Sequence, residues 1–129
     1  MKPFFITQYV LKLLTQDQAV NEIFGQNIYP LNAKQSTKFP FAVMQRSSIV
    51  PEYSKDGHHE YNIKVKVICA DDNYANNVEG AEAIRNALEL RSYMDENVHI
   101  RRITLDDATE MMISEAFVQE LTFNICLQI

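Results

Sequence analysis

The stretch that decides the fold is residues 60–90, EYNIKVKVICADDNYANNVEGAEAIRNALEL. From Tyr61 to Cys69, apolar side chains alternate with mainly polar ones, which is the period of a β-strand with one face on a core. After residues 70–72, apolar side chains recur every three or four positions, which is typical of an amphipathic helix. That apolar stripe comprises Tyr74, Val78, Ala81, Ile84, Ala87 and Leu88. Asp71 or Asp72 is expected to cap the first turn of this helix.

Two short helices are expected before this stretch. Pro3 is suited to a helix start, and the residues that follow it recur at helical spacing. Those residues are Ile6, Tyr9, Val10, Leu13 and Leu14. Thr15 and Gln18 have the spacing of a capping box, and Gly25 is expected to end the second helix. An extended piece, Ile28-Tyr29-Pro30, follows.

Three more strands are expected around the central strand and helix. One begins at Phe39 and runs to about Ile49, and the residues from Val50 to His59 form a long exposed connection. Val98–Leu105 is predicted as a strand, and Asp106–Ser114 as a turn or irregular loop. Ala116–Ile129 alternates over a length unusual for a small domain. We expect this last strand to project past the sheet or to pair with another subunit.

The predicted order is helix, helix, strand, strand, helix, strand, strand. Strands that come in consecutive pairs favour antiparallel pairing. We therefore predict one α+β domain over residues 1–129, with a mainly antiparallel four- to five-stranded sheet and helices packed on one face. The side chains expected in its core are Leu13, Val65, Val67, Ile84, Leu88, Leu121, Phe123 and Ile125.

Composition limits the classes of protein that fit. With 129 residues and 47% hydrophobic side chains, the chain is long enough for one real core and too apolar for wholesale disorder. A formal net charge of −5 argues against stable binding to DNA. No apolar run approaches the length of a membrane span, and the first residues lack the features of a signal peptide. We expect a soluble protein made inside the cell, with no membrane partner.

No cluster of side chains indicates chemistry. His58, His59 and Glu60 suggest metal ligands, but an exposed loop beside a strand start explains them as well. The acidic pair Asp71-Asp72 is explained by helix capping, and the cluster Asp106, Asp107 and Glu110 by a solvated turn. We expect no catalytic residue, no metal site and no cofactor. Cys69 and Cys126 are expected to be buried free thiols, with a disulfide between neighbouring strands as the alternative.

The long exposed connection and a pair of arginines fit a surface for assembly better than a catalytic site. The Val50–His59 connection is longer than a usual hairpin loop and carries an amphipathic tyrosine among charged side chains. Arg101-Arg102 suits an acidic partner, although two neighbouring residues of a strand also point to opposite faces. The candidate partner-binding residues are Tyr53, Lys55, Asp56, His58, Arg101 and Arg102.

The order of short motifs resembles a known family. Ile28-Tyr29-Pro30 follows the expected stop at Gly25, and Phe39-Pro40-Phe41-Ala42-Val43-Met44 follows a polar loop. The strand ending at Ala70 leads into Asp72-Asn73-Tyr74-Ala75, with Ala81 and Leu88 further along the helix. From about Tyr9 to Leu127, the chain resembles the tail-completion, or tail-terminator, proteins of long-tailed bacteriophages and prophages. The polar loop Leu31–Lys38 departs from the family pattern in its length.

This resemblance implies a structural protein and not an enzyme. Members of the family form a ring, usually a hexamer, at the head-proximal end of the tail tube. The implied partners are other copies of the chain, the tail tube protein and the head-connector protein, first in the host cytoplasm and then in the virion. The family has no catalytic motif, so no residue role is carried over. A stand-alone ligand-binding or regulatory domain, or an enzyme with an unrecognised site, are the alternatives.

Overall fold

A computed structural model of the protein describes residues 2–33, 37–57 and 59–128. Its elements follow the predicted order, with short additions at the N-terminus and at the two edges of the sheet. They are a 3₁₀ turn (Pro3–Phe5), α1 (Ile6–Gln16), α2 (Gln18–Phe24), β1 (Ile28–Pro30), β2 (Phe41–Tyr53), β3 (His59–Asp71), α3 (Tyr74–Leu88), β4 (Tyr93–Met94), β5 (His99–Ile113) and β6 (Ala116–Gln128).

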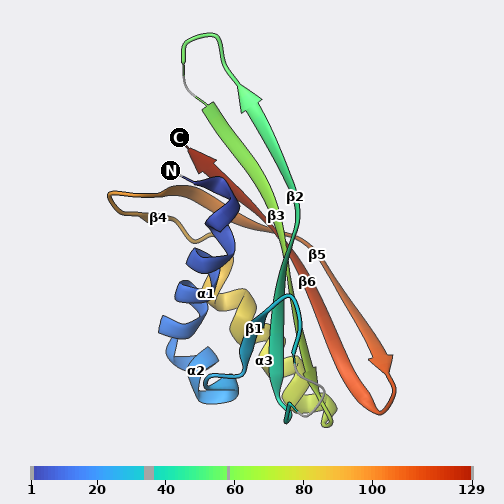
Figure 1. Ribbon diagram of the computed structural model, residues 1–129. Helices are drawn as coiled ribbons and strands as arrows, with labels where there is room; N and C mark the ends of the chain where they lie inside the picture. Colours follow the sequence, from blue (N-terminus) through green and yellow to red (C-terminus); the bar gives the residue numbers. More distant parts are fainter. Residues whose placement is uncertain (1, 34–36, 58, 129) are drawn as a thin grey trace.

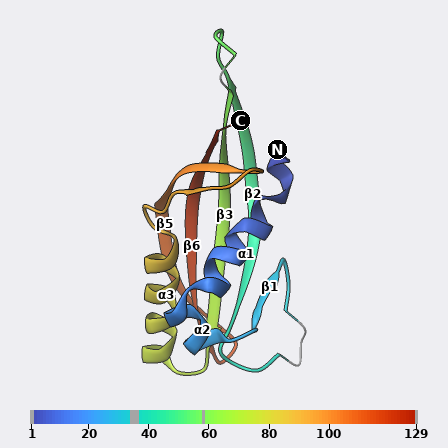
Figure 2. The same cartoon turned by 90° about the vertical axis from the view of Figure 1, so that its left-hand side faces the viewer.

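The strands form one sheet in the order β1-β2-β3-β6-β5-β4 (Figure 1). All neighbouring pairs are antiparallel except β1 and β2, which run parallel. The three α-helices lie on the same face of this sheet (Figure 2). The predicted α+β class is therefore confirmed, but the sheet has six strands because Ile28–Pro30 and Tyr93–Met94 add short edge strands.

The core lies between the sheet and the helices. Leu13, Val65, Val67, Ile84, Leu88, Leu121, Phe123 and Ile125 are all buried, as predicted. The two cysteines are free thiols on opposite faces of the sheet, with Cys69 buried and Cys126 half-buried. Burial raises the pKa of the Cys69 thiol to about 12, which keeps this thiol neutral.

The helix caps differ from the predicted ones. Asp17, not Thr15, caps α2, because its Oδ1 accepts a hydrogen bond from the Val20 N–H at 3.0 Å. The β3 strand continues to Asp71, so the cap of α3 falls on Asn73, whose Oδ1 accepts from the Asn76 N–H at 3.0 Å. In each case the observed cap lies one or two residues after a predicted one and is also a short polar residue that suits this position.

The buried face of α3 is also displaced in its first half. Tyr74 is exposed, while Asn77 and Gly80 are buried. A Cβ atom at Gly80 would lie 2.9 Å from the ring of Phe24, so α2 and α3 approach closely where glycine lacks a side chain. The predicted apolar stripe was therefore wrong at Tyr74, and it is confirmed from Ala81 onward, where the side chains pack against the core.

Both long hairpins are more regular than predicted. Strand β2 reaches Tyr53 and β3 begins at His59, so the connection has ordinary hairpin length instead of spanning Val50–His59. Strand β5 continues to Ile113 and pairs with β6 up to Ala116. The prediction of a turn or loop at Asp106–Ser114 was wrong, since only residues 114 and 115 separate these two strands.

Strand β6 occupies the centre of the sheet. It pairs with β3 along one edge and with β5 along the other, up to Gln128. Its backbone is therefore satisfied within the chain, and the prediction that this strand pairs with another subunit was wrong for the described residues. Its first residues do project past the core, as part of the β5–β6 hairpin (Figure 1).

Candidate functional site

No three His, Cys, Asp or Glu side chains within residues 2–33, 37–57 and 59–128 are placed together to hold a metal ion. In the same part of the chain, no helix has the length and apolar content needed to cross a membrane. His58 of the proposed metal pair lies outside the described residues. The absence of a metal site and of a catalytic residue stays a prediction.

Asp71 is a buried carboxylate beside an acidic hollow. It is 5% exposed, and the hollow next to it is lined by Pro40, Asp72 and Glu79. Burial, reinforced by the carboxyl group of Asp72, raises the pKa of Asp71, although the N–H of Asn73 bonds to its Oδ1 at 3.2 Å. Folding therefore disfavours the charged form of Asp71 relative to the unfolded chain.

Replacing Asp71 with asparagine is expected to stabilise the protein by about 1 kcal/mol at pH 7, because a buried charge is removed while an acceptor remains. Because folding raises the pKa of Asp71, its carboxyl group costs the folded state little at low pH, where the group is neutral. The cost appears as pH rises and the group becomes charged. The difference in unfolding free energy between Asp71→Asn and the parent should therefore shrink toward zero as pH falls. Urea denaturation at a series of pH values from 7 to 3 measures this difference. Glu79→Gln, at an exposed position of the same hollow, is the control; equal pH profiles for the two variants would contradict the assignment.

One candidate assembly surface is the tip of the β2–β3 hairpin, here called the β2–β3 arm (residues 50–60). It extends past the helices at one end of the molecule (Figure 1). Tyr53 is 73% exposed and Val50 is 52% exposed, which are high values for such side chains. The ring of Tyr53 lies edge-on to His59, with centroids 5.4 Å apart. Lys55 and Asp56 are exposed in the turn beyond them.

Arg101 lies at the base of this arm and Arg102 is exposed beside it. The guanidinium of Arg101 forms an ion pair with Glu60. The two residues sit at an irregularity in the pairing of β5 with β6, between Ile100 and Arg102. The structure thus places Tyr53, Glu60 and Arg101 at one end of the sheet. The partner-binding role of these candidate residues remains a proposal.

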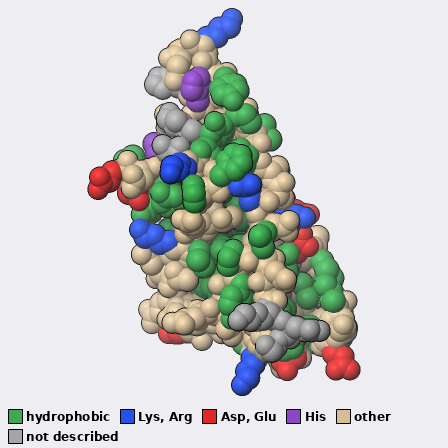
Figure 3. Space-filling model, in the orientation of Figure 1, with side chains coloured by type: hydrophobic (Ala, Val, Ile, Leu, Met, Phe, Trp, Pro, Cys, Tyr) green, Lys and Arg blue, Asp and Glu red, His purple; other side chains and the backbone are tan. Residues whose placement is uncertain are grey.

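A second projection is the β5–β6 hairpin, of which only the projecting last strand was predicted. The β5–β6 arm (residues 106–117) extends past the core at the opposite end of the sheet (Figure 1). Met112 is 60% exposed and Ile113 is 57% exposed, and Glu115 is exposed in the turn that follows them. Asp107 is exposed nearer the base of the arm, where it pairs with Thr122. Figure 3 shows hydrophobic and acidic side chains together at the lower right, where this arm lies. The sequence signal was the run Met111-Met112-Ile113 between acidic residues, which fits an exposed loop poorly.

The base of the β5–β6 arm is anchored to the rest of the molecule. Tyr74 at the start of α3 packs edge-on against Phe117, with centroids 5.5 Å apart. Its hydroxyl donates to Glu110 at 2.8 Å, and Gln119 donates to the same carboxylate at 2.9 Å. These hydrogen bonds lower the pKa of Glu110, with that of Gln119 contributing most. The arm is therefore a fixed extension of the sheet.

The sheet face opposite the helices carries an apolar groove. Phe41 and Val43 of β2 and Ile68 of β3 line it, together with Val118 of β6 and Ile113 of the β5–β6 arm. Its volume is about 490 Å³. The alternation that buries one side of each strand against the helices leaves this second, smaller apolar band on the other side.

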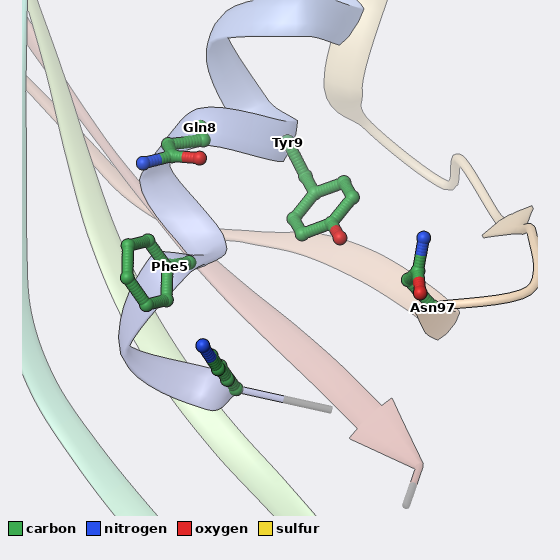
Figure 4. Close-up of a pocket in the computed structure, with 5 residues that line it drawn as sticks. Phe5, Gln8, Tyr9 and Asn97 are labelled. Carbon is green, nitrogen blue, oxygen red and sulfur yellow. The ribbon is translucent and has the colours of Figure 1, made fainter.

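A third surface feature lies at the N-terminus and was not predicted. The N-terminal patch comprises Lys2, Phe4, Phe5, Tyr9 and Arg46. Phe4 is 68% exposed and the Arg46 guanidinium lies 4.5 Å from the centre of its ring. Beside Phe5 is a hollow of about 360 Å³, lined also by Lys2 and Tyr9 (Figure 4). No local sequence pattern indicates this patch, because Arg46 of β2 reaches Phe4 only in the folded chain.

Comparisons with known proteins agree with this architecture. The family model described as tail completion protein gp17 matches residues 8–127. A solved chain from the virion of a native gene transfer agent particle has a TM-score of 0.75 and 13% sequence identity, covering 92% of this chain and 91% of that one. That likeness shows the fold. The comparison with curated proteins gave no match. Because the family model spans nearly the whole sequence, this chain belongs to the tail completion protein gp17 family of phage structural proteins.

Proposed function

We propose that the protein forms a ring at the head-proximal end of a phage tail tube, where it ends tube growth and joins the tail to the head connector. The expected ring is a hexamer, and its partners are the tail tube protein and the head-connector protein. The protein acts as a structural component without catalysis, assembled in the host cytoplasm and retained in the virion tail. Membership of the tail-completion family and a similar fold in a virion particle support this proposal.

One structural observation carries the proposal. The two long hairpins project past the core at opposite ends of the sheet, and both expose large apolar side chains. These include Tyr53 on the β2–β3 arm and Met112 on the β5–β6 arm. Exposed apolar groups on projecting elements are typical of protein interfaces. Surfaces at opposite ends suit a head-to-tail contact, which closes into a ring when the rotation between subunits divides a full turn.

The charge of the chain is compatible with a DNA passage. A net charge of −5 per subunit supplies no general electrostatic attraction for DNA phosphates. A ring of such subunits would let DNA pass without retaining it.

The test removes the β2–β3 arm while preserving strand pairing. Glu52 lies opposite Glu60 and Tyr53 opposite His59, so an Asn-Gly turn that replaces residues 53–59 keeps the remaining register. We expect this variant to fold with unchanged far-ultraviolet circular dichroism, because the removed residues lie outside the core. It should lose tail completion in a phage complementation assay and show a reduced mass in light scattering.

A milder variant separates the parts of the arm. Replacing only residues 54–58 with Asn-Gly retains Tyr53 and His59 and removes Lys55 and Asp56. If this variant is active and the variant lacking residues 53–59 is not, the contact is assigned to the pair Tyr53 and His59. If the variant lacking residues 53–59 completes tails and self-associates like the parent, the arm is a passive hairpin and its proposed role is wrong.

A further inference from the structure

The β5–β6 arm combines flexible apolar side chains with unpaired negative charge. Met112 is 60% exposed, Met111 is 36% exposed, and methionine adapts its shape to aromatic surfaces. Asp107 and Glu115 form no ion pair with a described cation. The arm therefore has exposed apolar side chains at its tip, with Glu115 beside them in the turn and Asp107 nearer its base.

The N-terminal patch has the complementary chemistry. Phe5 is 45% exposed, and the Lys2 ammonium lies 5.6 Å from the centre of its ring. The Arg46 guanidinium stacks on Phe4 and donates to its carbonyl oxygen at 3.0 Å. Neither cation forms an ion pair with a described carboxylate. The patch is thus an aromatic surface with two positive charges available to an acidic partner.

The hollow of the patch can accept an apolar side chain. It is open to solvent and has a volume of about 360 Å³. Figure 4 shows the Tyr9 ring between Phe5 and Asn97, which comes from the turn before β5. A thioether beside aromatic rings makes a favourable contact, and the amide groups of Gln8 and Asn97 line the rest of the hollow.

We propose that the β5–β6 arm of one copy docks on the N-terminal patch of the next, with Met112 in the hollow beside Phe5. Glu115, in the turn beside the tip, then lies toward Lys2 and Arg46, and Asp107 adds negative charge nearer the base of the arm. This inference rests on the proposed ring and names the contact between its subunits.

A second copy is favoured as the occupant because both halves of the contact are present on one chain. The arm and the patch lie at opposite ends of the molecule in both views (Figures 1 and 2), so one copy cannot bind its own patch. Their charges are opposite in sign, which favours attraction and suppresses arm-to-arm contact. Each added copy leaves one free arm and one free patch, as a closing head-to-tail ring requires.

The experiment reverses the charge of each surface separately. The arm variant carries Asp107→Lys with Glu115→Lys, and the patch variant carries Lys2→Glu with Arg46→Glu. Each should weaken self-association roughly a hundredfold in sedimentation equilibrium, because like charges meet at the contact. A one-to-one mixture of the two variants should restore assembly. The positive arm of one variant then meets the negative patch of the other, and the unchanged arm meets the unchanged patch. A single chain that carries both pairs of substitutions should also assemble, because its arm is positive and its patch is negative.

Two controls accompany these variants. Glu22→Lys with Glu79→Lys makes the same change of net charge as the arm variant at exposed helical positions, and it should assemble like the parent. If Arg46→Glu disturbs folding, Lys2→Glu with Gln8→Glu tests the patch without touching the contact of Arg46 with Phe4.

The outcomes separate this contact from the ring itself. If the parent assembles and both variants assemble equally well, the docking contact is wrong and the ring proposal stands. If the variants are impaired but their mixture does not recover, the two surfaces bind other partners and the pairing between copies is wrong. If the parent stays monomeric at high concentration and in the presence of tail tubes, the ring proposal and this contact both fail.

Discussion

Phe123→Ala is expected to lower the free energy of unfolding by about 3–5 kcal/mol, because it leaves a cavity in a close-packed core. Phe123 is 1% exposed and lies on β6, the central strand. Its neighbours across the sheet are Val65 on one side and Leu105 on the other. Both neighbouring strands are fixed by their own pairing, so the cavity cannot close by a local shift. Urea denaturation monitored by circular dichroism measures the change.

The matched control is Thr122→Ala, one residue earlier on the same strand. Thr122 faces the opposite side of the sheet and is half-buried, so its truncation should cost less than about 1 kcal/mol. A loss below about 1 kcal/mol for Phe123→Ala as well would mean that the face of β6 toward the helices is not the packed one.

The sequence was sufficient for the elements that bury one face. The sequence patterns of β3, β6 and α1 are clear because each of these elements has two faces in very different environments. One face packs against the core and the other lies largely toward water. The edge strands β1 and β4 are too short to show a period, which is why the strand count was underestimated. The choice between Asp17 and Thr15 as a cap depends on where the chain turns, and both residue types suit that role.

The second half of β5 was missed for a physical reason. From Asp106 to Glu115 every side chain is exposed, so both faces of this segment have the same environment and no alternation results. Pairing with β6 holds this half of the strand in place. Its acidic residues and the pair Asp106-Asp107 are typical of turns, which favoured the wrong prediction.

The candidate site was predictable only in part. Tyr53 and Lys55 were recognised because they lie in a polar segment between two clear strands. The N-terminal patch was not, because Phe4 meets Arg46 and Phe5 shares a hollow with Asn97 only in the folded chain, and these residues are distant in sequence. Complementarity between two surfaces at opposite ends of a molecule has no local sequence signal.

Asn77→Asp is expected to destabilise the protein by about 3 kcal/mol at pH 7, although the two side chains have nearly the same shape. Asn77 is 2% exposed, and its Nδ2 donates to the Cys69 carbonyl oxygen at 3.1 Å. The substitution replaces this donor with a carboxylate oxygen, which faces another acceptor in a dry site. The Asn77 Oδ1 atom already lacks a partner among the described residues, so no donor is in place to compensate.

Two effects oppose each other at this position. The first turns of α3 lie at the positive end of the helix dipole, which favours a carboxylate by up to about 2 kcal/mol in partly buried geometries. Taking an unpaired charge out of water costs more than this, so the destabilisation prevails. The folded state should therefore raise the pKa of the introduced carboxyl group. Stability should recover as pH falls and be lost again as pH rises through that pKa.

Asn76→Asp provides the comparison, because it makes the same chemical change one residue away. Asn76 is exposed and is the third residue of α3, where a carboxylate is favoured by the helix dipole without desolvation. Asn76 also lines the acidic hollow with Asp72 and Glu79, so repulsion there opposes the gain from the helix dipole. This variant should therefore differ from the parent by less than about 1 kcal/mol at pH 7. Urea denaturation of both variants at pH 7 and pH 4 measures the contrast. Equal stabilities at both pH values would show that water reaches the junction of α3 with β3, and that the Asn77 amide does not join these two elements.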